Sequence, residues 1–227
     1  MSLILTGKTN VVGAVSDAAT WRELAAGQQP LPCDLVELRV DALPDEAQRL
    51  PLSTPCPKPL LITPRHAGEG GARPAWDEAA RRALAEELLP AAAALDWEIA
   101  QLEGAEELLR AARAQGVALI ASAHYFHSMP SLATMRELES RAHEAGAAVV
   151  KIAFTPQSDA DVERGLEFLT SCRMPAAIMG MGPVYGPRSR ALYTAHGSVL
   201  LYGYLGSQPT APGQMSAAEC SALTARG

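Results

Sequence analysis

Short apolar runs rich in β-branched residues alternate along this chain with longer segments in which apolar residues recur at helical spacing. Such alternation is typical of repeated strand–helix units. The pattern predicts eight strands, over Asn10–Val15, Leu35–Val40, Pro59–Thr63, Leu95–Ala100, Val117–Ser122, Ala148–Ala153, Ala176–Met181 and Val199–Tyr204. It also predicts helices, over Trp76–Leu89, Ala105–Gln115, Ser131–Ala145, Asp159–Ser171, Arg188–Ala195 and Ser216–Thr224.

The strand count and the length of 227 residues together favour one architecture. Eight strands, each followed by a helix, fit a (β/α)8 barrel, the TIM-barrel fold, which usually has about 250 residues and can form with about 200. The competing architecture is an open doubly wound sheet, which usually carries a G-x-G-x-x-G loop after its first strand. The segment Val15-Ser-Asp-Ala-Ala-Thr20 has no such motif. We therefore expect an α/β protein with one (β/α)8 barrel domain over residues 1–227.

The second predicted strand carries charges where a barrel strand should be apolar on both faces. Glu37, Arg39 and Asp41 alternate with apolar residues, so all three share one face. An alternating strand can also be the solvated edge of an open sheet. Because a barrel has no edge strand, we expect these charges to lie in the mouth of the barrel.

A lysine interrupts the apolar sixth strand. The chain has three lysines in all, and the alternation places Lys151 on the inner face of this strand. Burial favours the neutral amine of a lysine, and a neutral amine is a nucleophile toward carbonyl carbon. The alternative is that Lys151 pairs with a carboxylate such as Glu37 or Asp41 and only stabilises the barrel mouth.

Further polar residues follow other predicted strands. His124 ends the fifth strand, one strand from Lys151, at the carboxyl edge where barrel enzymes build their active sites. An imidazole there could accept and donate protons near neutral pH. Arg65 and Glu69 lie in a glycine-rich loop after the third strand, and Arg190 follows the seventh. Loops after strands seven and eight often bind phosphate, and an arginine there suits a carboxylate equally well.

Composition narrows the class of partner. The formal net charge is −6 and the pI about 5.4, and no Lys/Arg cluster occurs, which disfavours nucleic acid or an anionic membrane as a partner. The four cysteines are widely spaced without a C-x-x-C pair, and no two histidines have a metal-binding spacing, so we expect no metal site. The chain has neither a basic leader nor an apolar stretch of membrane-spanning length. We expect a cytoplasmic protein that acts on a small molecule.

Six short fragments follow one another at suitable strand positions. They are Glu37-Leu-Arg39-Val-Asp41, Arg65 with Glu69-Gly-Gly71, His124-Tyr-Phe126, Lys151-Ile-Ala153, Ser189-Arg190 and Ala211-Pro-Gly-Gln214. In this order they resemble the type I 3-dehydroquinate dehydratases of the shikimate pathway. The resemblance implies a (β/α)8 barrel without metal or organic cofactor, and a family tendency toward homodimers.

The resemblance also implies catalytic roles for three residues. Lys151 would form an imine with the C3 ketone of 3-dehydroquinate, which acidifies the proton on C2. His124 would take that proton, protonate the departing C1 hydroxyl, and assist imine formation and hydrolysis. Glu69 would orient His124 and raise its basicity. The products would be 3-dehydroshikimate and water.

Six further residues would hold the substrate. Arg190 would bind its carboxylate, with Thr210 and Gln214 closing over it from the last loop. The ring hydroxyls would be held, and the lysine positioned, by Glu37, Arg39 and Arg65.

The chain departs from the family pattern at three points. Tyr125 follows His124 where many relatives have Asp or Asn, and Thr210 stands where serine is usual. The loop between Met181 and Arg190 is one residue longer than expected. The first and third departures lie beside the histidine and the arginine of the family pattern.

Two other functions fit the sequence. One is another imine-forming barrel enzyme, such as a class I aldolase, which would need a phosphate site in the last two loops. The other is a barrel that binds a shikimate-type acid without converting it.

Overall fold

The computed structural model describes residues 8–27, 30–74, 76–207, 209 and 214–225, in which parallel strands form one sheet of eight. The strand order is β7-β6-β5-β4-β3-β2-β1-β8. The sheet curls into a nearly closed barrel, where the N–H of Val199 donates to the carbonyl of Ala176 at 3.0 Å and brings the two ends together. The predicted barrel is thus confirmed. The strands are β1 (Asn10–Val15), β2 (Leu35–Arg39), β3 (Leu60–Thr63), β4 (Ala94–Glu98), β5 (Ala118–Tyr125), β6 (Val149–Phe154), β7 (Ala176–Gly180) and β8 (Leu200–Tyr204).

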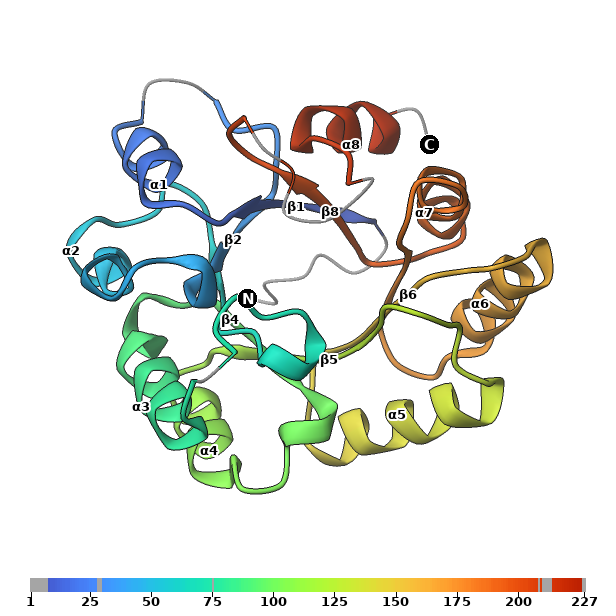
Figure 1. Cartoon of the computed structure of the whole chain (residues 1–227), viewed down its shortest axis with the longest axis horizontal. Coiled ribbons are helices and arrows are strands. Elements are labelled where there is room, and N and C mark those ends of the chain that lie inside the picture. Colours follow the sequence, from blue (N-terminus) through green and yellow to red (C-terminus); the bar gives the residue numbers. More distant parts are fainter. Residues whose placement is uncertain (1–7, 28–29, 75, 208, 210–213, 226–227) are drawn as a thin grey trace.

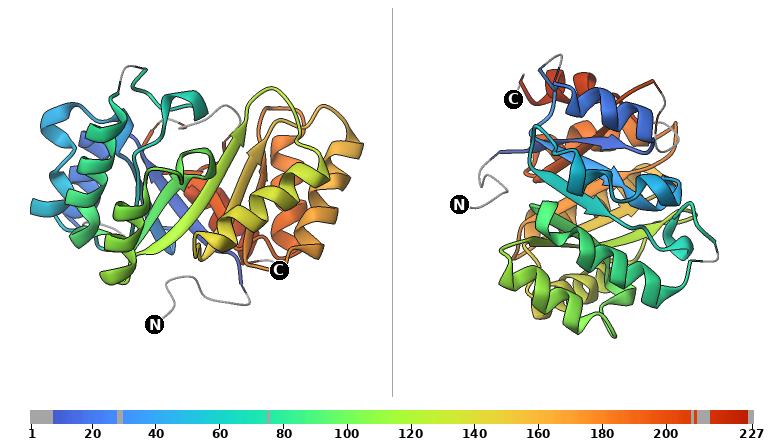
Figure 2. Two further views of the ribbon diagram at one scale, coloured as in Figure 1. Left: turned by 90° about the horizontal axis from the view of Figure 1, so that it is seen from below. Right: turned by 90° about the vertical axis from the view of Figure 1, so that its left-hand side faces the viewer.

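Helices surround the strands in the view along the barrel (Figure 1), and the side views show them on the outside (Figure 2). The six predicted helices all form, with ends within two residues of the prediction. α1 and α2 were not predicted, because α1 buries only two of its side chains and α2 has four residues. The helices are α1 (Ala18–Ala25), α2 (Leu50–Ser53), α3 (Glu78–Leu88), α4 (Glu106–Ala114), α5 (Leu132–Glu144), α6 (Asp159–Ser171), α7 (Gly186–Ala195) and α8 (Ala217–Thr224).

Helix ends follow the local sequence. The side chain of Ser158 accepts a hydrogen bond from the backbone N–H of Asp161 and caps the start of α6. Gly116 and Gly146 follow α4 and α5 with φ of +73° and +72°, a conformation that side chains disfavour and glycine adopts freely. These stops return the chain to the next strand of the barrel.

Several strand ends differ from the prediction by one to three residues, and two of these differences affect the barrel mouth. β2 ends at Arg39, and Val40–Ala42 form a 3-10 turn, so Asp41 enters the mouth from a turn and not from a strand. β5 runs on to Tyr125, so His124 lies inside a strand. Its position there is fixed by pairing of β5 with β6, in which His124 is opposite Ala153.

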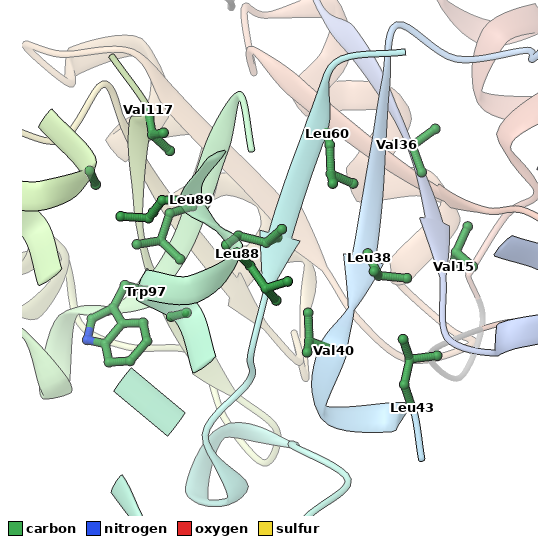
Figure 3. Packing of buried hydrophobic residues seen from close by; sticks show 14 of the residues in the cluster. Val15, Val36, Leu38, Val40, Leu43, Leu60, Leu88, Leu89, Trp97 and Val117 are labelled. Atoms are coloured by element: carbon green, nitrogen blue, oxygen red, sulfur yellow. The ribbon is translucent and has the colours of Figure 1, made fainter. Parts of the chain in front are cut away.

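The apolar side chains form an outer layer and an inner layer. In the outer layer, Val36, Leu38 and Val40 of the β2 segment pack in one cluster with Leu88 of α3, as the alternation predicted (Figure 3). The inner layer fills part of the barrel with side chains such as Val12, and its other members include Leu61, Ala94, Ile120, Val149, Ala177 and Leu200. The same strands carry buried charges further along, and these charges form the candidate site.

Candidate active site

Lys151 lies inside the barrel with 5% of its side chain exposed. Its Nζ donates to Oδ2 of Asp96, on β4, at 2.8 Å, and lies 4.3 Å from the centre of the Tyr202 ring, on β8. The sequence suggested a neutral amine, or a pair with a carboxylate such as Glu37 or Asp41. The carboxylate that contacts the amine is instead Asp96, because β4 also points a charged side chain inward.

Asp96 accepts hydrogen bonds from three side chains. Arg65 Nη2 donates to its Oδ1 at 2.8 Å, and the Ser122 hydroxyl donates to the same oxygen at 2.6 Å. Burial alone would raise the pKa of the Asp96 carboxyl, but the cations of Arg65 and Lys151 hold that pKa well below its usual range. Lys151 therefore faces a carboxylate that stays ionised although it is fully buried.

His124 and Glu69 form the second reactive pair. Nδ1 of His124 lies 2.8 Å from Oε2 of Glu69, and the same oxygen accepts the backbone N–H of His124 at 2.9 Å. Glu69 reaches this position from the 3-10 turn Ala67–Glu69, which follows β3. Because this oxygen is already an acceptor, Nδ1–H is the natural donor, which leaves the lone pair of Nε2 available.

Burial shapes the protonation of this pair. Burial, together with the cations of Arg65 and Lys151, lowers the pKa of His124 well below its ordinary value. Burial also raises the pKa of Glu69 to about 7. The imidazole is therefore neutral near neutral pH and able to accept a proton, and its carboxyl partner titrates in the same range.

The charged residues of the β2 segment form hydrogen bonds across part of the barrel mouth. Nε and Nη2 of Arg39 donate to the two carboxylate oxygens of Asp41 at 2.9 and 2.8 Å, and Nη2 also donates to the carbonyl of Gly70 at 3.2 Å. Glu37 accepts the Thr63 hydroxyl at 2.8 Å. Arg39 thus holds the loop that carries Glu69 against the end of β2.

Arg190 lies on the opposite side of the mouth, in the middle of α7. It is 4% exposed, and its Nε and Nη1 donate to the backbone carbonyls of Gly180 and Tyr202 at 3.1 and 3.0 Å. No carboxylate in the described part of the chain forms an ion pair with it, and burial lowers the pKa of its guanidinium. Gln214 is half-buried, and Thr210 lies outside the described residues.

Comparison with known proteins identifies the family. The sequence model of the type I 3-dehydroquinase family matches residues 14–225 of the chain. The chain belongs to this family. A 3-dehydroquinate dehydratase of Methanocella arvoryzae is 32% identical over 209 residues, which cover 90% of this chain and 90% of that protein. Another, of Halobacterium salinarum, is 38% identical over 213 residues, which cover 88% and 92%.

A solved member of the type I 3-dehydroquinase family has the same fold. The crystal structure of 3-dehydroquinate dehydratase from Geobacillus kaustophilus matches with a TM-score of 0.82 and 26% identity, over 97% of this chain and 91% of that one. Family membership makes the chain an enzyme of the lyase class. Among the described residues there is no cluster of three or more His, Cys, Asp or Glu that could hold a metal ion, and no helix could span a membrane.

Four residues of this 3-dehydroquinase site were missed by sequence reasoning. Asp96 and Glu98 alternate with apolar residues along β4, which is the same signal that indicates the charges of β2. Ser122 and Tyr202 are uncharged, so they carry no such signal. The register of the barrel was needed to bring these four side chains to Lys151 and Arg65.

Proposed function

We propose that the chain dehydrates 3-dehydroquinate to 3-dehydroshikimate through an imine at Lys151. The observation that carries this proposal is the pairing of a buried Lys151 with Asp96 beside a His124–Glu69 pair on the neighbouring strand. Attack on the C3 ketone requires the neutral amine, so Nε2 of His124 accepts the extra proton of Lys151 while the ionised Asp96 holds the amine in place. His124 then returns this proton to the hydroxyl of the carbinolamine, which leaves as water. Imine formation releases one water, and the protonated imine then withdraws electrons from C2.

His124 moves the protons of the elimination. Its free Nε2 takes the proton from C2, which gives an enamine, and the resulting imidazolium then protonates the C1 hydroxyl as it leaves as water. Water hydrolyses the conjugated imine and restores the amine of Lys151. Glu69 holds the ring of His124 and stabilises the imidazolium through the hydrogen bond at Nδ1.

Arg190 binds the carboxylate of the substrate. A buried guanidinium whose partners among the described residues are carbonyls favours an anionic ligand, and a carboxylate can accept two parallel N–H bonds from it. Thr210 and Gln214, from the loop after β8, are proposed to contact the same carboxylate. The ring hydroxyls are proposed to contact the β2 and β3 side of the mouth, formed by Glu37, Arg39 and Arg65.

The conjugated enone of the product gives a direct test. Purified protein mixed with 3-dehydroquinate should give growing ultraviolet absorbance, and mixing with sugar phosphates should give no aldol cleavage. Binding of 3-dehydroquinate without absorbance growth would favour a non-catalytic acid binder. Borohydride adducts formed with sugar phosphates and not with 3-dehydroquinate would favour an aldolase.

A homodimer and a cytoplasmic location stay predictions. Size-exclusion chromatography with light scattering measures the mass in solution, and a value near twice the chain mass of 23.9 kDa is expected. A monomer that retains full turnover would show that the site needs no second copy.

A further inference from the structure

An outer helix contributes a buried arginine that the reaction above does not use. Arg81, on α3, is 1% exposed, although α3 lies on the outside of the barrel (Figure 1). Arginine is almost never fully buried unless it is paired. Its guanidinium lies 3.7 Å from the centre of the Trp97 ring, and Nη1 donates to the carbonyl of Pro64 at 2.7 Å. Its Nε and Nη2 donate to the two carboxylate oxygens of Glu78, on the same helix, at 2.9 and 2.8 Å.

Glu98 connects this arginine to the candidate site. One carboxylate oxygen, Oε2, accepts Nη1 of Arg81 at 2.7 Å. The other, Oε1, accepts Nη1 of Arg65 at 2.7 Å and the backbone N–H of His66 at 2.9 Å. Glu98 is 0% exposed, so each of these contacts is shielded from water. Glu98 therefore bridges two arginines.

The contacts form one line of alternating charge from the outer helix to the reactive amine. Arg65 continues it to Asp96, and Asp96 ends it at Lys151, each step an ion pair of 2.7–2.8 Å. All five groups are at most 5% exposed. Charges in such a buried line are weakly screened by water and salt. Removing a charge at one end therefore changes the electrostatic potential at the other end. The line runs Arg81, Glu98, Arg65, Asp96, Lys151.

We propose that Arg81 and Glu98 are positioning residues, which set the pH range in which Lys151 forms its imine through the Arg65–Asp96 pair. This inference rests on the proposed function, because it assumes that Lys151 is the imine-forming amine. Removing the positive charge of Arg81 leaves an excess of negative charge along the line and stabilises the ammonium. Removing the negative charge of Glu98 has the opposite effect.

Other charged or titratable groups also surround Lys151, and the experiment must leave these residues unmutated. Asp96 from β4 contacts it directly, Tyr202 from β8 covers it, and His124 from β5 and Arg65 from the loop after β3 interact with the same cluster. Glu37 from β2 acts on Tyr202. The variants below change none of these residues. Opposite shifts in the pH midpoint of imine trapping would therefore be caused by the charges of Arg81 and Glu98.

The experiment measures how reductive trapping of the Lys151 imine with 3-dehydroquinate depends on pH. The midpoint of its acidic limb should rise in Arg81→Met and fall in Glu98→Gln, each by about 0.5–1 pH unit, the Coulomb scale for a buried charge at an effective dielectric of about 20. The double variant should lie between them. The matched control is Arg82→Met, which removes the same charge from a neighbouring position where the side chain is 34% exposed and pairs only loosely with Glu78, at 3.8 Å. Its midpoint should not move.

A purely structural role would lower the amount of folded protein and leave the midpoint in place. If Arg81→Met does not fold, Arg81→Lys, which keeps the charge, must retain the wild-type midpoint while Glu98→Gln still falls. Equal midpoints in Glu98→Gln and wild type, or shifts of both single variants in one direction, would overturn the inference. Absence of trapping in the wild-type protein would instead refute the imine itself, so the two failures are distinguishable.

Discussion

Two buried arginines mark opposite sides of the barrel mouth, and their surroundings differ. Arg65, on the β3–β6 side, meets the carboxylates of Asp96 and Glu98 and the hydroxyl of Ser122. Arg190, on the β7–β8 side, meets only backbone carbonyls among the described residues. The guanidinium of Arg65 is therefore paired with carboxylates, and that of Arg190 has no carboxylate partner in the described part of the chain.

The difference separates two tasks within one site. A buried charge is tolerated where partners compensate for its lost hydration, and removing a partner leaves an uncompensated charge. The compensated side can hold Lys151 and Asp96 in fixed positions through each turnover. No anion among the described residues pairs with Arg190, so under the proposed function the substrate carboxylate is its partner. On this account the paired side performs the chemistry and the unpaired side selects the substrate.

The largest loss of rate is expected on the catalytic side. His124→Ala should lower kcat by about 10²–10⁴-fold, the usual contribution of a general acid–base. It should still allow the imine to accumulate, because Lys151 and Asp96 remain in place. Mass spectrometry after borohydride reduction measures the imine, and stopped-time enone absorbance measures turnover. A His124→Ala protein with wild-type kcat would remove the imidazole from the mechanism.

Arg65→Met tests whether the paired side depends on compensation. It removes one cationic partner from each of Asp96 and Glu98, so the free energy of unfolding should fall by about 3–5 kcal/mol. Chemical denaturation with the wild type as reference measures this loss. An unchanged denaturation midpoint would show that the network is not what holds these carboxylates.

Arg190→Gln is the matched change on the other side. It should raise KM for 3-dehydroquinate by about 10²-fold, since a charge-assisted hydrogen bond to the carboxylate contributes about 1.5–3 kcal/mol. Stability should change little, because the arginine has no protein carboxylate to leave unpaired. Steady-state kinetics measures the change in KM, and chemical denaturation, as the control, measures the change in stability. A loss of stability as large as that of Arg65→Met would abolish the distinction between the two sides.

Tyr202→Phe should have the smallest effect. The hydroxyl of Tyr202 is buried without a hydrogen-bond partner among the described residues, and its pKa is raised well above the ordinary value by burial, so it stays a donor. Phenylalanine keeps the ring over Lys151 and removes the unsatisfied group. We expect the thermal midpoint to rise, and kcat/KM to fall by about 10-fold if the hydroxyl donates to the substrate. A lower midpoint would indicate a structural hydrogen bond instead.

Strand periodicity was enough to predict the barrel but not the contacts inside it. The alternation at Glu37, Arg39 and Asp41 indicated inward charges, and the inward orientation of Lys151 followed from the same rule. Short helices such as α1 escaped prediction, since a helix that buries two residues shows little apolar repeat.

The sequence does not determine which carboxylate pairs with Lys151, and the reason is physical. Asp96 lies on β4 and Lys151 on β6, two strands away in the sheet. Their contact depends on the register through β5, where Glu98 is opposite Ser122 and Ser122 is opposite Lys151. Periodicity gives the face of a side chain but not its height in the barrel, so several carboxylates remained equally good candidates.

The most direct test of the central claim is borohydride reduction of the wild-type protein in the presence of 3-dehydroquinate, followed by peptide mass spectrometry. The account predicts one adduct, on the peptide that contains Lys151, with none on Lys8 or Lys58 and none in Lys151→Ala, which should also lose turnover. Enone formation without any adduct, or full turnover by Lys151→Ala, would contradict covalent catalysis by this lysine.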